Sequence, residues 1–189
     1  MLLSRLFLIV AVLWPVAEIV LQVMTRAKRA TSSVRDRGSH AALWIVIALA
    51  LVAGSLLAAR VPARIPVPTT WLLLLSLALL IAGLVIRTMA ILTLGRFFTS
   101  NVAIQAGHTI VREGLYKHIR HPSYTGLLLA FLALALSMGN WIGLVVVVVP
   151  ITAVVLYRIR VEESALMEAF GQEYAEYRRS TRCLVPYVY

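Results

Sequence analysis

Long runs of apolar residues, separated by short basic segments, constrain the fold of this 189-residue chain more than any other feature. A helix needs about 20 predominantly apolar residues to cross the hydrocarbon core of a bilayer, and several runs approach that length. Apolar residues make up 61% of the sequence, well above the share found in soluble domains. We therefore predict an all-α integral membrane protein.

The runs predict five transmembrane helices in a single domain, residues 1–189. The predicted spans are residues 2–24, 41–59, 71–94, 122–138 and 142–157. Residues 25–40 carry five basic residues against one acidic residue, and the long loop 95–121 is basic as well. Because Lys and Arg are enriched in cytoplasmic loops, both segments and a C-terminal helix over about residues 158–179 are expected in the cytoplasm.

Two charged residues inside the predicted spans need an explanation, because ionised side chains are costly in hydrocarbon. Glu18 is expected to make a structural polar contact with other helices or at an interface. Arg87, near the cytoplasmic end of the third span, is expected to extend its side chain to the lipid headgroups.

Composition also excludes several classes of function. The net charge of +10 lies mostly in the connections between spans, where it meets anionic membrane lipids, so nucleic acid is not an expected partner. The single cysteine, Cys183, excludes an internal disulfide and a thiolate metal cluster. The four histidines lack the spacing of a zinc site, so no metal is expected.

A polar cluster over residues 120–124, Arg-His-Pro-Ser-Tyr, interrupts the apolar pattern at the start of the fourth span. His121 precedes a proline, which biases its backbone away from the helix that follows. Its ring then either points into a site at the helix end or serves as a structural hydrogen-bond partner. Arg158 and Glu162, four residues apart, share one helical face and either form an ordinary ion pair or belong to the same site.

These residues together resemble the isoprenylcysteine carboxyl methyltransferase family in order and spacing. The resemblance covers roughly residues 101–186, and the first spans match only as generic apolar helices. The matching elements are residues 108–116, residues 120–124, Arg158, Glu162, Glu163 and the Phe-Gly-x-x-Tyr-x-x-Tyr pattern over residues 170–177.

The resemblance implies a membrane methyltransferase that uses S-adenosylmethionine as methyl donor and releases S-adenosylhomocysteine. It implies that Arg158 is the catalytic residue and binds the substrate carboxylate, and that Glu162 holds the cofactor. The other implied cofactor-binding residues are Gln105, His108, Thr109, Ile110, Val111, Tyr116, His121, Pro122, Ser123 and Tyr124.

The expected reaction is carboxyl O-methylation of an isoprenylcysteine-like or other lipophilic acid, either a small molecule or a prenylated protein. Two alternatives stay open: an acceptor that is a phospholipid amine or a small thiol, with His121 or Glu163 as base, and a non-enzymatic membrane protein that binds a small ligand. The short chain resembles prokaryotic members of the family. We therefore expect it in the inner membrane, with its site on the cytoplasmic side.

Overall fold

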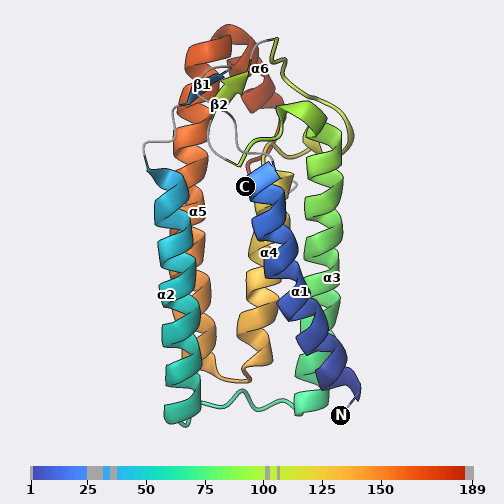
Figure 1. Ribbon diagram of the computed structural model, residues 1–189, viewed down its shortest axis with the longest axis vertical. Helices are drawn as coiled ribbons and strands as arrows, with labels where there is room; N and C mark the ends of the chain where they lie inside the picture. The colour runs from blue at the N-terminus through green and yellow to red at the C-terminus, as the bar shows by residue number, and fades with distance from the viewer. Residues whose placement is uncertain (1, 25–31, 35–37, 101–102, 106, 186–189) are drawn as a thin grey trace.

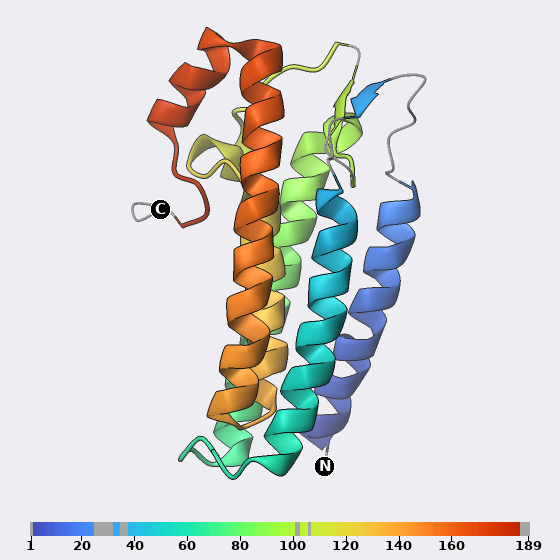
Figure 2. The same ribbon diagram turned by 90° about the vertical axis from the view of Figure 1, so that its left-hand side faces the viewer.

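The computed structural model of the protein describes residues 2–24, 32–34, 38–100, 103–105 and 107–185. Long helices lie side by side, and a smaller layer of short elements covers one end of them (Figures 1 and 2). The long helices are α1 (Leu2–Met24), α2 (Ser39–Arg60), α3 (Thr69–Leu94), α4 (Pro122–Ser137) and α5 (Trp141–Phe170). The covering layer holds α6 (Gln172–Ser180), the 3-10 turns η1 (Gly95–Phe97) and η2 (Gly114–Lys117), and the strands β1 (Ser32–Val34) and β2 (Ala103–Gln105).

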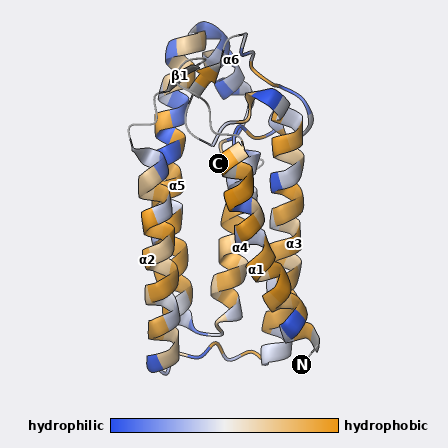
Figure 3. Ribbon diagram, in the orientation of Figure 1, coloured by the Kyte–Doolittle hydropathy of each residue, from blue (hydrophilic) through white to orange (hydrophobic). Residues whose placement is uncertain are grey.

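The prediction of a helical membrane protein is confirmed. Helices α1, α2, α3 and α5 are long and apolar enough to cross a bilayer, whereas α4, the predicted fourth span, is a shorter apolar helix of 16 residues. Many large apolar side chains on the long helices are exposed, as expected for surfaces that face lipid. Polar residues gather instead at the end covered by α6 and β1 (Figure 3).

Two features of the covering layer differ from the prediction. The expected helix over residues 158–179 is divided: α5 continues without interruption to Phe170, and α6 begins after Gly171. Gly171 takes φ 52° and ψ −121°, a conformation that a side chain disfavours. The fold also contains a strand pair, since β1 and β2 are antiparallel, with Ser32 opposite Gln105.

Local signals in the sequence set where two helices of the bundle begin. Pro122 occupies the first turn of α4, where its missing N–H costs no hydrogen bond. Asn140 caps α5, because its side-chain oxygen accepts hydrogen bonds from the backbone N–H groups of Ile142, at 2.9 Å, and Gly143, at 3.1 Å. Its amide nitrogen also donates to the Val61 carbonyl at 2.8 Å, which ties the α4–α5 turn to the end of α2.

Close helix packing aligns the polar ends of α3 and α4. Gly83 and Gly126 face each other, and a Cβ built on Gly126 would lie 2.4 Å from the Gly83 carbonyl oxygen. Small residues allow this approach, which is a common way of packing helices in membranes. As a result, Arg87 on α3 lies beside the start of α4, where the polar cluster of the sequence is located.

Helix α1 is joined to this packed pair by a buried ion pair. Arg87 donates from Nε to Glu18 Oε2 at 2.8 Å, and its Nη2 pairs with the other carboxylate oxygen. Its Nη1 donates to the Ser123 hydroxyl at 2.7 Å. The structural contact expected of Glu18 is therefore present, whereas the prediction that Arg87 reaches the headgroups was wrong. A bidentate carboxylate inside the bundle satisfies the guanidinium better than an extended conformation would.

Candidate functional site

A cavity of about 130 Å³ lies where the long helices meet the covering layer. Its wall is drawn from α2, α3, α4, α5 and α6 and from the connection between α3 and α4. Apolar side chains such as Leu43, Ile47 and Leu127 line part of it, and charged and aromatic side chains line the rest. The cavity thus joins an apolar region to a polar one.

The structure brings most of the predicted site residues to this one cavity. Those that line it are His108, Thr109, Ile110, Val111, Tyr116, His121, Ser123, Tyr124, Arg158 and Glu162. Pro122 is buried and does not line it, so its contribution is to start α4. Gln105 belongs to β2, and its side chain lies outside the described part of the structure.

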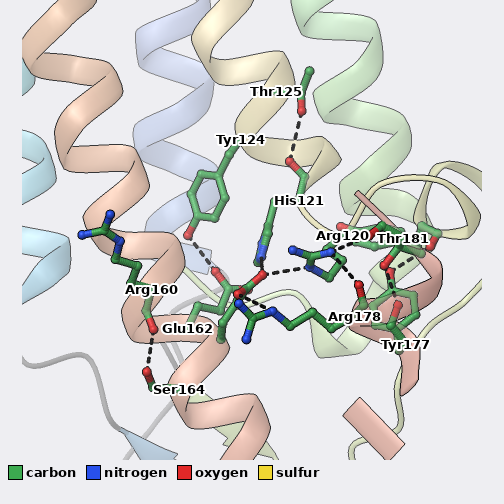
Figure 4. A network of polar contacts seen from close by, with 12 residues as sticks. Arg120, His121, Tyr124, Thr125, Arg160, Glu162, Ser164, Tyr177, Arg178 and Thr181 are labelled. Atoms are coloured by element: carbon green, nitrogen blue, oxygen red, sulfur yellow. Dashed lines mark hydrogen bonds and ion pairs between the residues drawn. The ribbon is translucent and has the colours of Figure 1, made fainter. Parts of the chain in front are cut away.

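Tyr124 contacts both Arg158, the residue expected to bind the acceptor, and Glu162, the residue expected to bind the cofactor. Its hydroxyl donates to Glu162 Oε2 at 2.9 Å (Figure 4). The same hydroxyl accepts from Arg158 Nε at 2.9 Å. Arg158 also donates from Nη1 to the Ser39 hydroxyl at 2.9 Å and from Nη2 to the Ser100 carbonyl. The Arg158 guanidinium, 3% exposed, is therefore held in a fixed position at the cavity wall.

Glu163, next to Glu162, points to a different set of partners. Its carboxylate binds Arg120 Nε at 2.8 Å and His121 Nε2 at 3.2 Å, and Arg178 approaches it at 3.6 Å. These partners come from the start of α4 and from α6, so Glu163 connects both to α5. Glu163 therefore holds together the segments that form the site, whereas Glu162 lines the cavity.

The segment after α6 is tied across the start of α4. Backbone N–H groups of Arg120 and His121 donate to the carbonyls of Arg182, at 2.8 Å, and Cys183, at 3.1 Å. The Arg120 guanidinium donates to the Thr181 carbonyl at 2.6 Å. These bonds connect the backbone just before Pro122 to a segment that is distant in the sequence. They therefore hold the backbone of His121, whose side chain lines the cavity, in a fixed position.

His108 is held between aromatic rings on another side of the cavity. Its ring stacks on Phe97, with centroids 4.7 Å apart, and meets Phe170 edge-on at 5.5 Å. Burial lowers the pKa of His108 from its ordinary value, and the Glu162 carboxylate partly offsets this effect. The Nδ1 atom is buried and has no hydrogen-bond partner among the described residues.

Several residues in the cavity wall were not predicted as site residues. Arg87 and Tyr174 are among them; Arg87 was assigned to the headgroups, and Tyr174 was named only as part of the Phe-Gly-x-x-Tyr-x-x-Tyr pattern. His40 and Trp44, on α2, and Ser100 also line the cavity. The helical spacing of Leu166, Tyr174 and Tyr177 was the available signal, because all three face the cavity from α5 and α6.

Comparison with known proteins gives one consistent family. A model of the isoprenylcysteine carboxyl methyltransferase (ICMT) family matches residues 74–168. The chain is 34% identical over 120 residues to protein-S-isoprenylcysteine O-methyltransferase B of Arabidopsis thaliana, which covers 62% of this chain and 61% of the plant protein. It is also 34% identical over 116 residues to protein-S-isoprenylcysteine O-methyltransferase of Saccharomyces cerevisiae, which covers 60% of this chain and 48% of the yeast protein.

A solved structure shares the fold. The eukaryotic intramembrane Ras methyltransferase ICMT superposes with a TM-score of 0.63 at 27% sequence identity. The superposition covers 77% of this chain and 52% of that chain, so this chain matches about half of the solved protein.

Proposed function

The chain belongs to the isoprenylcysteine carboxyl methyltransferase family, and we propose that it is a membrane enzyme that methylates the carboxylate of a lipophilic acceptor with S-adenosylmethionine. The observation that carries the proposal is the convergence of residues 108–111, His121, Ser123, Tyr124, Arg158 and Glu162 on one cavity. These segments are far apart in the sequence, and the family resemblance had assigned them to one site before their positions were known.

The cavity offers donors and acceptors that suit an S-adenosyl ligand. Such a ligand carries an aromatic base, a ribose and an amino acid with both charges. The wall offers aromatic rings, the carboxylate of Glu162 for an ammonium group, and two buried polar atoms, on His108 and Tyr174, that lack a partner among the described residues. We assign the residues that line the cavity near Glu162 to this ligand.

When bound, S-adenosylmethionine supplies a methyl group on a positively charged sulfur. An acceptor carboxylate is ionised near neutral pH, so the protein needs no general base for this reaction. Its residues instead bind and orient the acceptor, and such alignment contributes a large part of the rate in reactions of this kind. Arg158 suits the task, because its planar guanidinium binds carboxylates in two-pronged geometry and its partners hold it still.

We infer that the acceptor has an apolar tail and that the site faces the cytoplasm. The apolar part of the cavity, with Leu43, Ile47 and Leu127, accommodates hydrocarbon next to Arg158. The basic connections at this end of the bundle support a cytoplasmic position, and we count α4 as a span together with α1, α2, α3 and α5, with the N-terminus outside and α6 in the cytoplasm. An inner membrane of a prokaryote is the proposed location.

Calorimetric titration of the detergent-solubilised protein with S-adenosylhomocysteine tests the proposal directly. We expect saturable binding, followed by labelled methyl transfer from S-adenosylmethionine to a farnesylcysteine analogue. A panel with phosphatidylethanolamine and a small thiol distinguishes the acceptor class. Folded protein that binds no S-adenosylhomocysteine would contradict the enzyme assignment, and transfer only to the amine or the thiol would contradict the carboxylate.

Replacing Glu162 with glutamine is expected to raise the dissociation constant for S-adenosylhomocysteine by about 10- to 100-fold. The reason is that a hydrogen bond to a charged group contributes about 1.5–3 kcal/mol, and glutamine keeps the size of the side chain but not its charge. The matched control is Glu168→Gln on the same helix, because Glu168 is exposed and does not line the cavity. If the two variants bound S-adenosylhomocysteine with equal affinity, Glu162 would not belong to the cofactor site.

A further inference from the structure

Tyr174, on α6, has a buried hydroxyl that finds no hydrogen-bond partner among the described residues. The side chain is 2% exposed and lines the cavity. Two other tyrosines of the cavity wall differ: the Tyr177 hydroxyl donates to the Tyr116 carbonyl at 2.8 Å, and the Tyr124 hydroxyl binds Glu162 and Arg158. Tyr174 thus lacks the hydrogen bonds that the Tyr124 and Tyr177 hydroxyls form.

An unpaired buried hydroxyl is costly. A buried polar group without a partner loses about 1–3 kcal/mol of solvation, and phenylalanine would fill the same volume without that loss. Four buried side-chain polar atoms lack a partner in the described part of the chain: those of Trp14, Ser76, His108 and Tyr174. Trp14 and Ser76 lie within the membrane-spanning helices α1 and α3, whereas His108 and Tyr174 line the same cavity. A ligand in that cavity would give both atoms a hydrogen-bond partner.

The surroundings of Tyr174 make it a hydrogen-bond donor. Burial raises the pKa of Tyr174 above its ordinary value; the negative charges of Glu163 and Glu162 raise it further, against the opposite effect of Arg120. The hydroxyl therefore stays protonated near neutral pH. A neutral donor beside carboxylates suits an oxygen or nitrogen acceptor on a ligand.

We propose that the Tyr174 hydroxyl donates a hydrogen bond to the bound S-adenosyl ligand, which makes Tyr174 a binding residue of the site. The inference rests on the proposed function and extends it to α6. It also assigns a role to the helix after Gly171, because α6 and the segment tied to Arg120 then close the cofactor side of the cavity. Packing alone does not require a hydroxyl at position 174, and Tyr177 forms its own hydrogen bond without Tyr174.

The test compares Tyr174→Phe with Tyr177→Phe, using calorimetry with S-adenosylhomocysteine and thermal melting without ligand. Tyr174→Phe is expected to raise the dissociation constant by about 3- to 10-fold, the loss of one net hydrogen bond, and to leave the melting temperature of the free protein equal or higher. Tyr177→Phe is expected to lower the melting temperature instead, because it breaks the bond to the Tyr116 carbonyl. The control for affinity is Tyr157→Phe, which is expected to leave the dissociation constant within about twofold, because Tyr157 is exposed and does not line the cavity.

The outcomes separate the inference from the proposed function. If the unsubstituted protein binds the ligand and Tyr174→Phe binds equally well, Tyr174 has no part in binding, although the function stands. If the unsubstituted protein itself binds nothing, both fail. Should the phenylalanine variant not fold, the hydroxyl is structural and the inference is overturned, unless Tyr174→Met folds and shows the same loss of affinity.

Discussion

Replacing Arg158 with lysine is expected to slow methyl transfer to a carboxylate acceptor by at least about 100-fold, the cost of misplacing a reacting group by about 1 Å. Affinity for S-adenosylhomocysteine is expected to change by less than about threefold. Lysine keeps the charge but offers no planar pair of donors, and it replaces a side chain that Tyr124, Ser39 and Ser100 hold in place. Single-turnover rates and calorimetry measure the two effects separately.

The control for Arg158 lies two residues further along the same helix. Arg160 is exposed and does not line the cavity, so Arg160→Lys is expected to leave both rate and affinity unchanged. If Arg158→Lys lost affinity for S-adenosylhomocysteine and kept its rate once the ligand was saturating, the assignment of Arg158 to the acceptor would be wrong. A melting curve of each variant shows whether the network around Tyr124 has survived.

Glu162 and Glu163 are neighbours in the sequence but differ in role, and spacing in the sequence indicates only the role of Glu162. The sequence alone left open whether Arg158 and Glu162 form an ion pair or belong to one site, and the structure joins both to the Tyr124 hydroxyl. Glu163 was a candidate base for an amine or thiol acceptor. In the structure it binds Arg120, His121 and Arg178, which supports a role in holding the start of α4.

The spans were predictable because hydropathy and the length of a bilayer crossing depend only on neighbouring residues. The predicted span 2–24 coincides with α1, and the predicted span 41–59 lies within α2. The family match to residues 74–168 confirms the resemblance, which rested on motif order. Such patterns report local structure and local chemistry well.

Contacts between distant segments were not predictable in this way. Arg87 meets Glu18 across 69 positions, and Arg158 meets Ser39 across 119. Nothing in the sequence near Arg87 indicates a partner on α1, so extension to the headgroups was the reasonable expectation. The orientation of Tyr174 likewise depends on the break at Gly171 and on the bonds that tie the C-terminal segment to Arg120.

The buried pair of Glu18 and Arg87 gives the second large expected effect. Glu18→Ala is expected to lower the free energy of unfolding by about 3–5 kcal/mol, because it leaves a buried guanidinium without its counter-charge. Arg87 is 7% exposed, and its contact with Ser123 alone does not neutralise it. Denaturant unfolding in detergent measures the change, and thermal melting gives the same ranking.

The matched control removes both charges. Glu18→Ala combined with Arg87→Met is expected to recover most of the lost stability, because replacing both members of a buried pair with apolar residues is often neutral. A double variant as unstable as Glu18→Ala would mean that helix packing, not charge, accounts for the loss.

Activity gives a second measurement of the Glu18→Ala variant. Arg87 also lines the cavity, so its unpaired guanidinium is expected to compete with Arg158 for an acceptor carboxylate. We therefore expect Glu18→Ala to impair turnover of a carboxylate acceptor more than it impairs binding of S-adenosylhomocysteine, which would connect α1, outside the family match, to the chemistry of the site.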